Sequence, residues 1–156
     1  MNADLRIAER DWMKLRKHSA LSFRSSGAPE TGALAILGEC RTGAKRDFIV
    51  AEVLLPEPRD LKYAATGALV FDASFMRRAH LAMRKRGLVG IATFHTHPGA
   101  SASVGFSLYD DRQDPLLVEN LLELEPRTQL VSVVVGKNSQ CARIFANCRS
   151  FFVLAE

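Results

Sequence analysis

Two histidines and an aspartate have the spacing expected of three ligands of one metal ion. His95 and His97 follow an apolar run, residues 88–94, that is typical of a buried strand, and Asp110 comes further along the chain. Side chains at positions i and i+2 of a strand point to the same side, so both imidazoles leave the strand end together. Two histidines and a carboxylate suit a zinc ion that keeps one position open for water. The spacing predicts a metal-dependent hydrolytic centre.

Asp110 also stands three residues after Ser107, and this spacing is close to that of a helix capping box. Both interpretations can hold together, because a helix N-terminus is a rigid place from which a carboxylate can be aimed at a metal. Asp111 and Asp114 are rival ligands that spacing alone does not exclude.

A metal hydrolase needs a further carboxylate that moves a proton and does not bind the metal. Glu30, ahead of the apolar segment 33–38, is the candidate, although an acidic residue before a strand is usually a plain loop charge. His18 and His80 fall in helical segments without partner residues, and we expect them to be structural or surface positions.

The elements that must position these residues follow from the apolar pattern. Alternating and continuous apolar runs predict strands, and apolar residues at helical spacing predict helices. The expected strands cover 4–8 (at an edge), 33–38, 48–55, 68–71, 88–94, 130–135, 141–145 and 151–154. The expected helices cover 10–22, a segment capped by Asp72 or Ser74 that ends at Gly87, and one from Ser107 that Pro115 breaks; 56–63 is an irregular loop. This pattern predicts a mixed α/β fold, a mixed central sheet with helices packed on it.

Length and composition indicate one compact domain over residues 1–156, of which 47% are hydrophobic. No apolar run is long enough for a membrane span, and the first residues lack the core of a signal peptide. Cys40, Cys141 and Cys148 have no tight spacing, so we expect reduced thiols in a cytoplasmic protein.

The net charge of +4 is modest, and the basic residues cluster in 77–86. No aromatic residues interleave with them for base stacking, so we expect no nucleic-acid partner. The cluster is either a solvated helix face or a surface for an acidic protein.

These motifs together resemble the JAMM (MPN-plus, JAB) metalloprotease family. His95-x-His97-Pro98, then Ser107-x-x-Asp110, with Glu30-Thr31-Gly32 upstream, carry the resemblance, which extends over residues 30–145. It implies an MPN-type fold and a Zn²⁺ cofactor held by His95, His97 and Asp110. It further implies that Glu30 is the general acid/base and that Ser107 donates a hydrogen bond to the bound water or the oxyanion.

The chain departs from the family pattern between its two motifs. Nine residues, 98–106, separate His97 from Ser107, a longer loop than the family usually has. Phe106 stands where many prokaryotic members have proline. A longer loop can bulge outward at little energetic cost, which leaves the ligands in place.

The resemblance also implies a substrate. Such proteins cleave bonds at the carboxyl end of ubiquitin or ubiquitin-like proteins, commonly isopeptide bonds to lysine. Small bacterial versions accompany activating- and conjugating-type enzymes, some in anti-phage defence operons. We expect the modifier's tail to lie along segment 56–67 or 99–106. The alternatives are a catalytically silent scaffold, or a peptidase that processes a sulfur-carrier-like protein.

Overall fold

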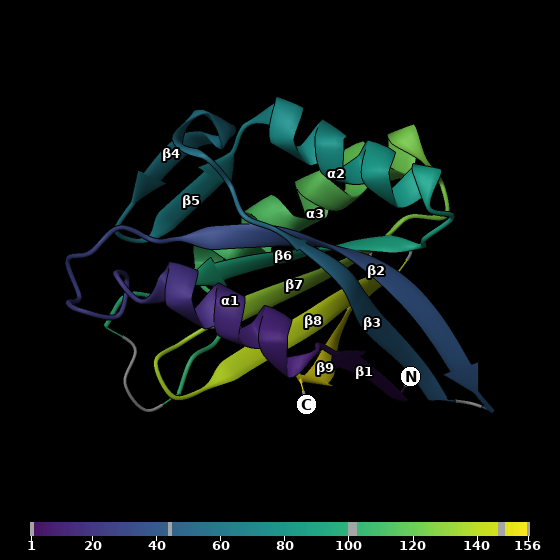
Figure 1. Ribbon diagram of the computed structural model, residues 1–156, viewed down its shortest axis with the longest axis horizontal. Helices are drawn as coiled ribbons and strands as arrows, with labels where there is room; N and C mark the ends of the chain where they lie inside the picture. The colour runs from purple at the N-terminus through teal and green to yellow at the C-terminus, as the bar shows by residue number, and fades with distance from the viewer. Residues whose placement is uncertain (1, 44, 100–102, 147–148, 156) are drawn as a thin grey trace.

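The computed structural model describes residues 2–43, 45–99, 103–146 and 149–155 (Figure 1). Cys148 and part of the 99–106 loop therefore lie outside the described residues. Cys40 is exposed, Cys141 is half-buried, and both are free thiols. None of the helices in the described ranges combines the length and apolar character that crossing a membrane requires.

One mixed sheet forms the centre of the fold. Its strands are β1 (Asn2–Arg6), β2 (Gly32–Thr42), β3 (Lys45–Leu54), β6 (Gly90–Thr96), β7 (Gln129–Val135), β8 (Gln140–Ala146) and β9 (Arg149–Ala155). They lie in the order β1-β3-β2-β6-β7-β8-β9, and the sheet closes because β1 also pairs with β9. The first strand was expected at an edge, and that expectation is wrong: β1 has a parallel neighbour on each side.

Helices cover both faces of this sheet (Figure 1), as the sequence predicts. Alternate residues of each strand point to opposite faces, so the same strands supply two apolar clusters. One cluster joins the strands to Leu15 and Trp12 of α1 (Glu9–Ser19). The other joins them to Phe75 of α2 (Ala73–Lys85) and Val118 of α3 (Leu108–Leu124). The mixed α/β fold is confirmed.

The start of α2 resolves an alternative that the sequence leaves open. The side chain of Asp72 accepts a hydrogen bond from the backbone N–H of Ser74 at 2.8 Å, so Asp72 is the N-cap. Past the other end, Gly87 has a φ of 64°, the left-handed conformation that favours glycine after a helix.

The expected break of α3 at Pro115 is wrong, because the helix is continuous from Leu108 to Leu124. A proline inside a helix costs about 3 kcal/mol, since it removes one hydrogen bond and crowds the preceding turn. Val118 and Leu121, each 3% exposed, lie beyond the proline. Burying such side chains contributes roughly 1.5–3 kcal/mol each, which offsets the proline.

The expected irregular loop at 56–63 is also wrong in part. It contains a 3-10 turn, η1 (Pro58–Asp60), and most of β4 (Leu61–Ala65), which pairs antiparallel with β5 (Ala68–Phe71). The β4 side chains are half-buried or exposed, so the strand lacks the apolar signal that sequence reading relies on. The carboxylate of Asp60 accepts a hydrogen bond from the Glu57 N–H at 3.0 Å and forms an ion pair with Arg78 of α2 at 2.8 Å.

Candidate metal centre

The histidine pair stands where β6 ends. His95 is the penultimate residue of the strand, and His97 follows Thr96, its last residue. The His95 side chain is on the face that α2 and α3 cover, because Phe94 and Ala92 belong to the cluster on the α1 side. The ring centroids of the two histidines lie 5.1 Å apart. The expectation that both imidazoles leave the strand together is confirmed.

Asp110 reaches both imidazoles from the first turn of α3. Its Oδ1 lies 3.1 Å from His95 Nε2, and its Oδ2 lies 3.4 Å from His97 Nε2. One ligand atom from each of these residues falls within 4.8 Å of the other two. This group has the donors and the compactness to hold a metal ion.

The chemistry of the group favours a cation over a simple hydrogen-bonded cluster. His95 Nε2 is buried, and its short contact with the carboxylate lacks hydrogen-bond geometry, so it has no such partner among the described residues. An imidazole lone pair and a carboxylate oxygen repel one another unless a proton or a metal lies between them. Two imidazoles and one carboxylate are a common zinc ligand set. The residues present fit zinc.

Burial and the neighbouring imidazoles act on Asp110 in opposite directions. Desolvation raises the pKa of its carboxyl, whereas His95 and His97 lower that pKa by more, so it lies well below its usual range. Asp110 is therefore a carboxylate at neutral pH, as a metal ligand must be.

Ser107 forms the predicted cap of α3. Its Oγ accepts a hydrogen bond from the Asp110 N–H at 3.2 Å, and its own N–H donates to Asp110 Oδ2 at 2.6 Å. The hydroxyl lies 2.8 Å from the same carboxylate oxygen, to which it donates. The capping box thus fixes the Asp110 side chain relative to the helix start.

Glu30 lies beside this group although it comes from a distant part of the chain. It is only 5% exposed, and the backbone N–H of Gly67 acts to lower the pKa of its carboxyl. Its own N–H donates to the carbonyl of Ala65 at 3.1 Å. The end of β4 therefore holds Glu30 through its backbone.

Burial is the largest influence on the Glu30 carboxyl. Desolvation raises its pKa, His95 and His97 lower it, and Asp110 raises it again, with a net increase over the ordinary value. A carboxyl with a raised pKa exchanges protons more readily near neutral pH, as a general acid/base must.

The segment after Glu30 approaches β6 closely. Hydrogen bonds join Thr31 and Thr96. The Thr31 N–H donates to Thr96 Oγ1 at 2.9 Å, and the Thr96 N–H donates to the Thr31 carbonyl at 2.9 Å. Gly32 pairs with His95, and a Cβ there would lie 2.3 Å from the Phe94 carbonyl oxygen. Only glycine fits this position without a shift.

A cavity of about 220 Å³ opens beside the cluster. Glu30, His95 and Asp110 form part of its wall, together with residues 69–71 of β5 and side chains of α2 and α3. The expected groove segment 56–67 does not line it, and Tyr63 is 54% exposed. The next strand, β5, lines the cavity instead.

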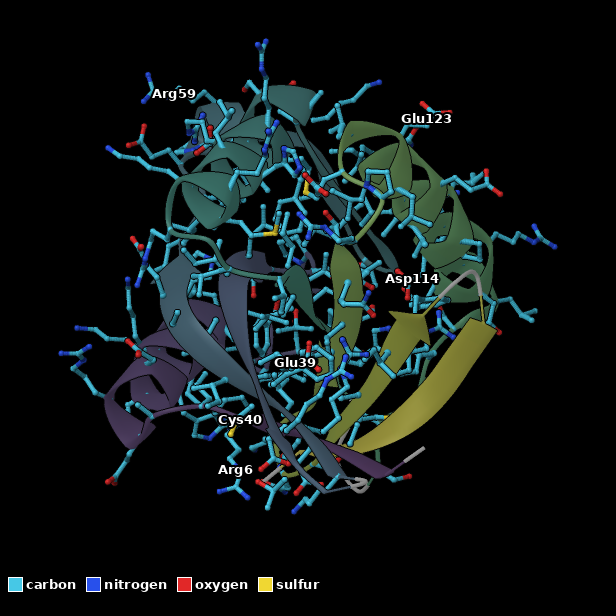
Figure 2. The ribbon with its side chains drawn as sticks, turned by 90° about the vertical axis from the view of Figure 1, so that its right-hand side faces the viewer. Arg6, Glu39, Cys40, Arg59, Asp114 and Glu123 are labelled. Atoms are coloured by element: carbon cyan, nitrogen blue, oxygen red, sulfur yellow. The ribbon has the colours of Figure 1, made fainter. Side chains whose placement is uncertain are left out.

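The rival ligands Asp111 and Asp114 are bound elsewhere. Arg143 of β8 donates to Asp114 Oδ2 from Nε at 3.1 Å and from Nη2 at 2.8 Å, and its Nη1 pairs with Asp111 Oδ1. Figure 2 shows Asp114 on the side of α3 that faces the sheet, whereas Glu123 points away from it. Sequence reading missed Arg143, although a lone arginine between Ala142 and Ile144 of an apolar strand was a usable signal.

The other two histidines lie outside the cluster, as expected. His18 Nε2 is 3.1 Å from the Gly32 carbonyl oxygen, so His18 supports the segment that follows Glu30. His80 is 4% exposed within α2, and burial lowers its pKa.

Comparison with known proteins agrees with this arrangement. No curated protein matches the chain. A family model described as prokaryotic homologs of the JAB domain matches residues 15–149, which include every residue of the cluster and Glu30. This match covers most of the chain, and the chain belongs to the prokaryotic JAB-domain family.

Proposed function

We propose that this protein is a zinc-dependent peptidase that hydrolyses the bond after the C-terminus of a ubiquitin-like protein, above all an isopeptide bond to lysine. Its setting would be a bacterial ubiquitin-like conjugation system, such as those of anti-phage defence, with activating- and conjugating-type enzymes. One observation supports the proposal most: a second buried carboxylate, Glu30, shares a cavity with the metal-binding group His95, His97 and Asp110.

The three clustered side chains would hold the metal and leave a position open for water. Zinc bound there would polarise the substrate carbonyl and lower the pKa of its water to about 7. Asp110 stays ionised, and His95 Nε2 has no competing hydrogen-bond partner in the described residues.

Glu30 would carry the proton. Its carboxylate takes a proton from the attacking water and gives it to the departing lysine amine, so the same group acts first as base and then as acid. The hydrogen bond from the Glu30 N–H to the Ala65 carbonyl holds this residue at the cavity wall during both steps. Since water is the nucleophile, no cysteine takes part.

Ser107 would stabilise negative charge on the substrate oxygen. Its hydroxyl donates to Asp110 Oδ2 in this structure, so it must turn to reach the substrate. The Ser107 N–H donates to the same carboxylate oxygen at 2.6 Å, and Asp110 therefore keeps a partner when the hydroxyl turns.

The substrate tail would lie along β5. Among the described strands β5 pairs only with β4, so its second edge offers free backbone groups to an extended peptide. Leu69 and Phe71 of this strand line the same cavity as His95. A tail bound there would bring its last carbonyl to the metal centre.

The test uses the full chain, loaded with zinc, and two fluorescent substrates. One is a ubiquitin-like protein joined to a lysine side chain, and the other is a linear fusion of that protein. Cleavage of the first that a chelator abolishes and zinc restores would support the proposal. Cleavage of the linear fusion alone would favour the sulfur-carrier-type peptidase, and zinc binding without cleavage of either would favour a scaffold.

A further inference from the structure

Arg143 is a buried cation on β8. It is 7% exposed, and its neighbours on β8, Ala142 and Ile144, belong to the apolar cluster on the opposite face. Burying a guanidinium is costly unless carboxylates pair with it. The side chains of Asp111 and Asp114 supply that pairing from α3.

The strand register relates Arg143 to the histidines. Arg143 is opposite Ser132 of β7, which is in turn opposite Thr93 of β6. The Thr93 hydroxyl donates to Ser132 Oγ at 3.3 Å, so a polar row crosses three strands. Thr93 and His95 are two residues apart and share a face. Arg143 and His95 therefore point to the same side of the sheet, toward α3.

Arg143 also contacts the chain just before the helix. Its guanidinium carbon lies 3.9 Å from the centre of the Phe106 ring. Phe106 directly precedes Ser107, the N-cap, and Asp111 directly follows Asp110. One side chain thus holds the chain on both sides of the capping box.

This end of α3 has few other anchors. Its buried apolar residues, Val118 and Leu121, come after Pro115. Proline has no N–H, so the carbonyl of Asp111 loses its helical partner and the first turn is less firmly tied to the rest of the helix. Asp110 and Asp114 are also like charges four residues apart, which repel each other. A cation on Asp114 relieves that repulsion.

We propose that Arg143 is a positioning residue for the metal centre. By holding Phe106, Asp111 and Asp114 it fixes the first turn of α3, and with it Asp110, against the histidines of β6. This inference rests on the metal site of the proposed function, but it concerns a residue that does not touch the metal.

The experiment compares zinc affinity in three variants of the full chain. Arg143→Met keeps the length and removes the charge, and Arg143→Lys keeps the charge but loses the two-pronged contact. Arg46→Met is the matched control, because Arg46 is also largely buried, pairs with Glu39 at 2.6 Å and lies 4.6 Å from the Phe48 ring, in the β2–β3 hairpin. Affinity is measured by competition with a chromophoric chelator, and ligand geometry by the absorption spectrum of bound Co²⁺.

We expect Arg143→Met to weaken zinc binding about 10–100-fold, the usual effect of losing a partner that orients a ligand. Arg143→Lys should fall between this variant and the wild type, and Arg46→Met should bind zinc as the wild type does. A folded Arg143→Met with unchanged affinity and an unchanged Co²⁺ spectrum would overturn the inference.

Two further measurements cover other outcomes. Should Arg143→Met not fold, Phe106→Leu removes the ring without leaving a buried charge unpaired, and wild-type zinc affinity in that variant refutes the inference. Should the wild type bind no zinc, the proposed function fails by itself. The claim that Arg143 fixes the first turn of α3 is then tested by amide hydrogen exchange at Asp110 and Asp111. Exchange there should be faster in Phe106→Leu than in Arg46→Met, and equal rates would refute the claim.

Discussion

Gly32 gives the sharpest test of how the Glu30 segment is positioned. A Cβ at this position would lie 2.3 Å from the Phe94 carbonyl oxygen and 2.4 Å from Leu69 Cδ2. The first neighbour is backbone of β6, so it cannot move away alone. The two strands would have to separate by roughly 0.7 Å to bring that contact to 3.0 Å.

The expected effect of Gly32→Ala follows from this shift. Overpacking of this kind costs about 1–3 kcal/mol of unfolding free energy. For a chain of this size that lowers the melting temperature by roughly 2–4 °C per kcal/mol. The separation also moves Glu30 relative to His95, and a displacement near 1 Å can reduce the rate about 10²-fold.

The same strand supplies a matched control. A Cβ at Gly38 would meet Leu88 Cδ2 at 3.6 Å and the Ile49 carbonyl oxygen at 3.9 Å, which are ordinary contacts. Gly38→Ala should therefore keep its stability and its rate of conjugate cleavage. Both variants are compared by thermal unfolding and by zinc-dependent cleavage. Equal stability and equal rates in the two variants would refute the reasoning about close approach.

Three other predictions concern catalysis, the cysteines and pH. Glu30→Gln should abolish cleavage and keep zinc binding, whereas His97→Ala should lose both; metal analysis with a cleavage assay separates them, and full activity in Glu30→Gln would remove the role assigned to it. Replacement of each cysteine by serine should retain activity, and loss of cleavage in a folded variant would point instead to a thiol nucleophile; the three positions are Cys40, Cys141 and Cys148. Asp60→Asn should lower stability at neutral pH, because the hydrogen bond from Arg78 holds the pKa of Asp60 below its usual value. A carboxyl whose pKa is lowered by folding stabilises the fold when the pH is above its pKa in the unfolded chain. That stabilisation is lost as the pH falls through its pKa in the folded protein, so the denaturation curves of the variant and the wild type should converge in acid. A difference in stability between the two that stays constant with pH would contradict this.

Several features of this protein follow from local spacing and could be predicted from the sequence. The interval between His95 and His97 places both imidazoles on one face of any strand, and the interval from Ser107 to Asp110 is that of a helix cap. The existence of α2 and the strands of the central sheet likewise follow from the apolar period and the turn residues. Such patterns hold because a strand or a helix imposes its own repeat on neighbouring side chains.

Other features depend on which elements meet, and only the tertiary structure decided them. Spacing favoured Asp110 but did not exclude Asp111 and Asp114. The rotation of α3 against the sheet directs Asp110 to the histidines and the other two to Arg143. Glu30 has no local signal, because its environment comes from a turn at Gly67 and from residues more than sixty positions away. Strand register and helix rotation result from packing between distant segments, for which a local repeat carries no information.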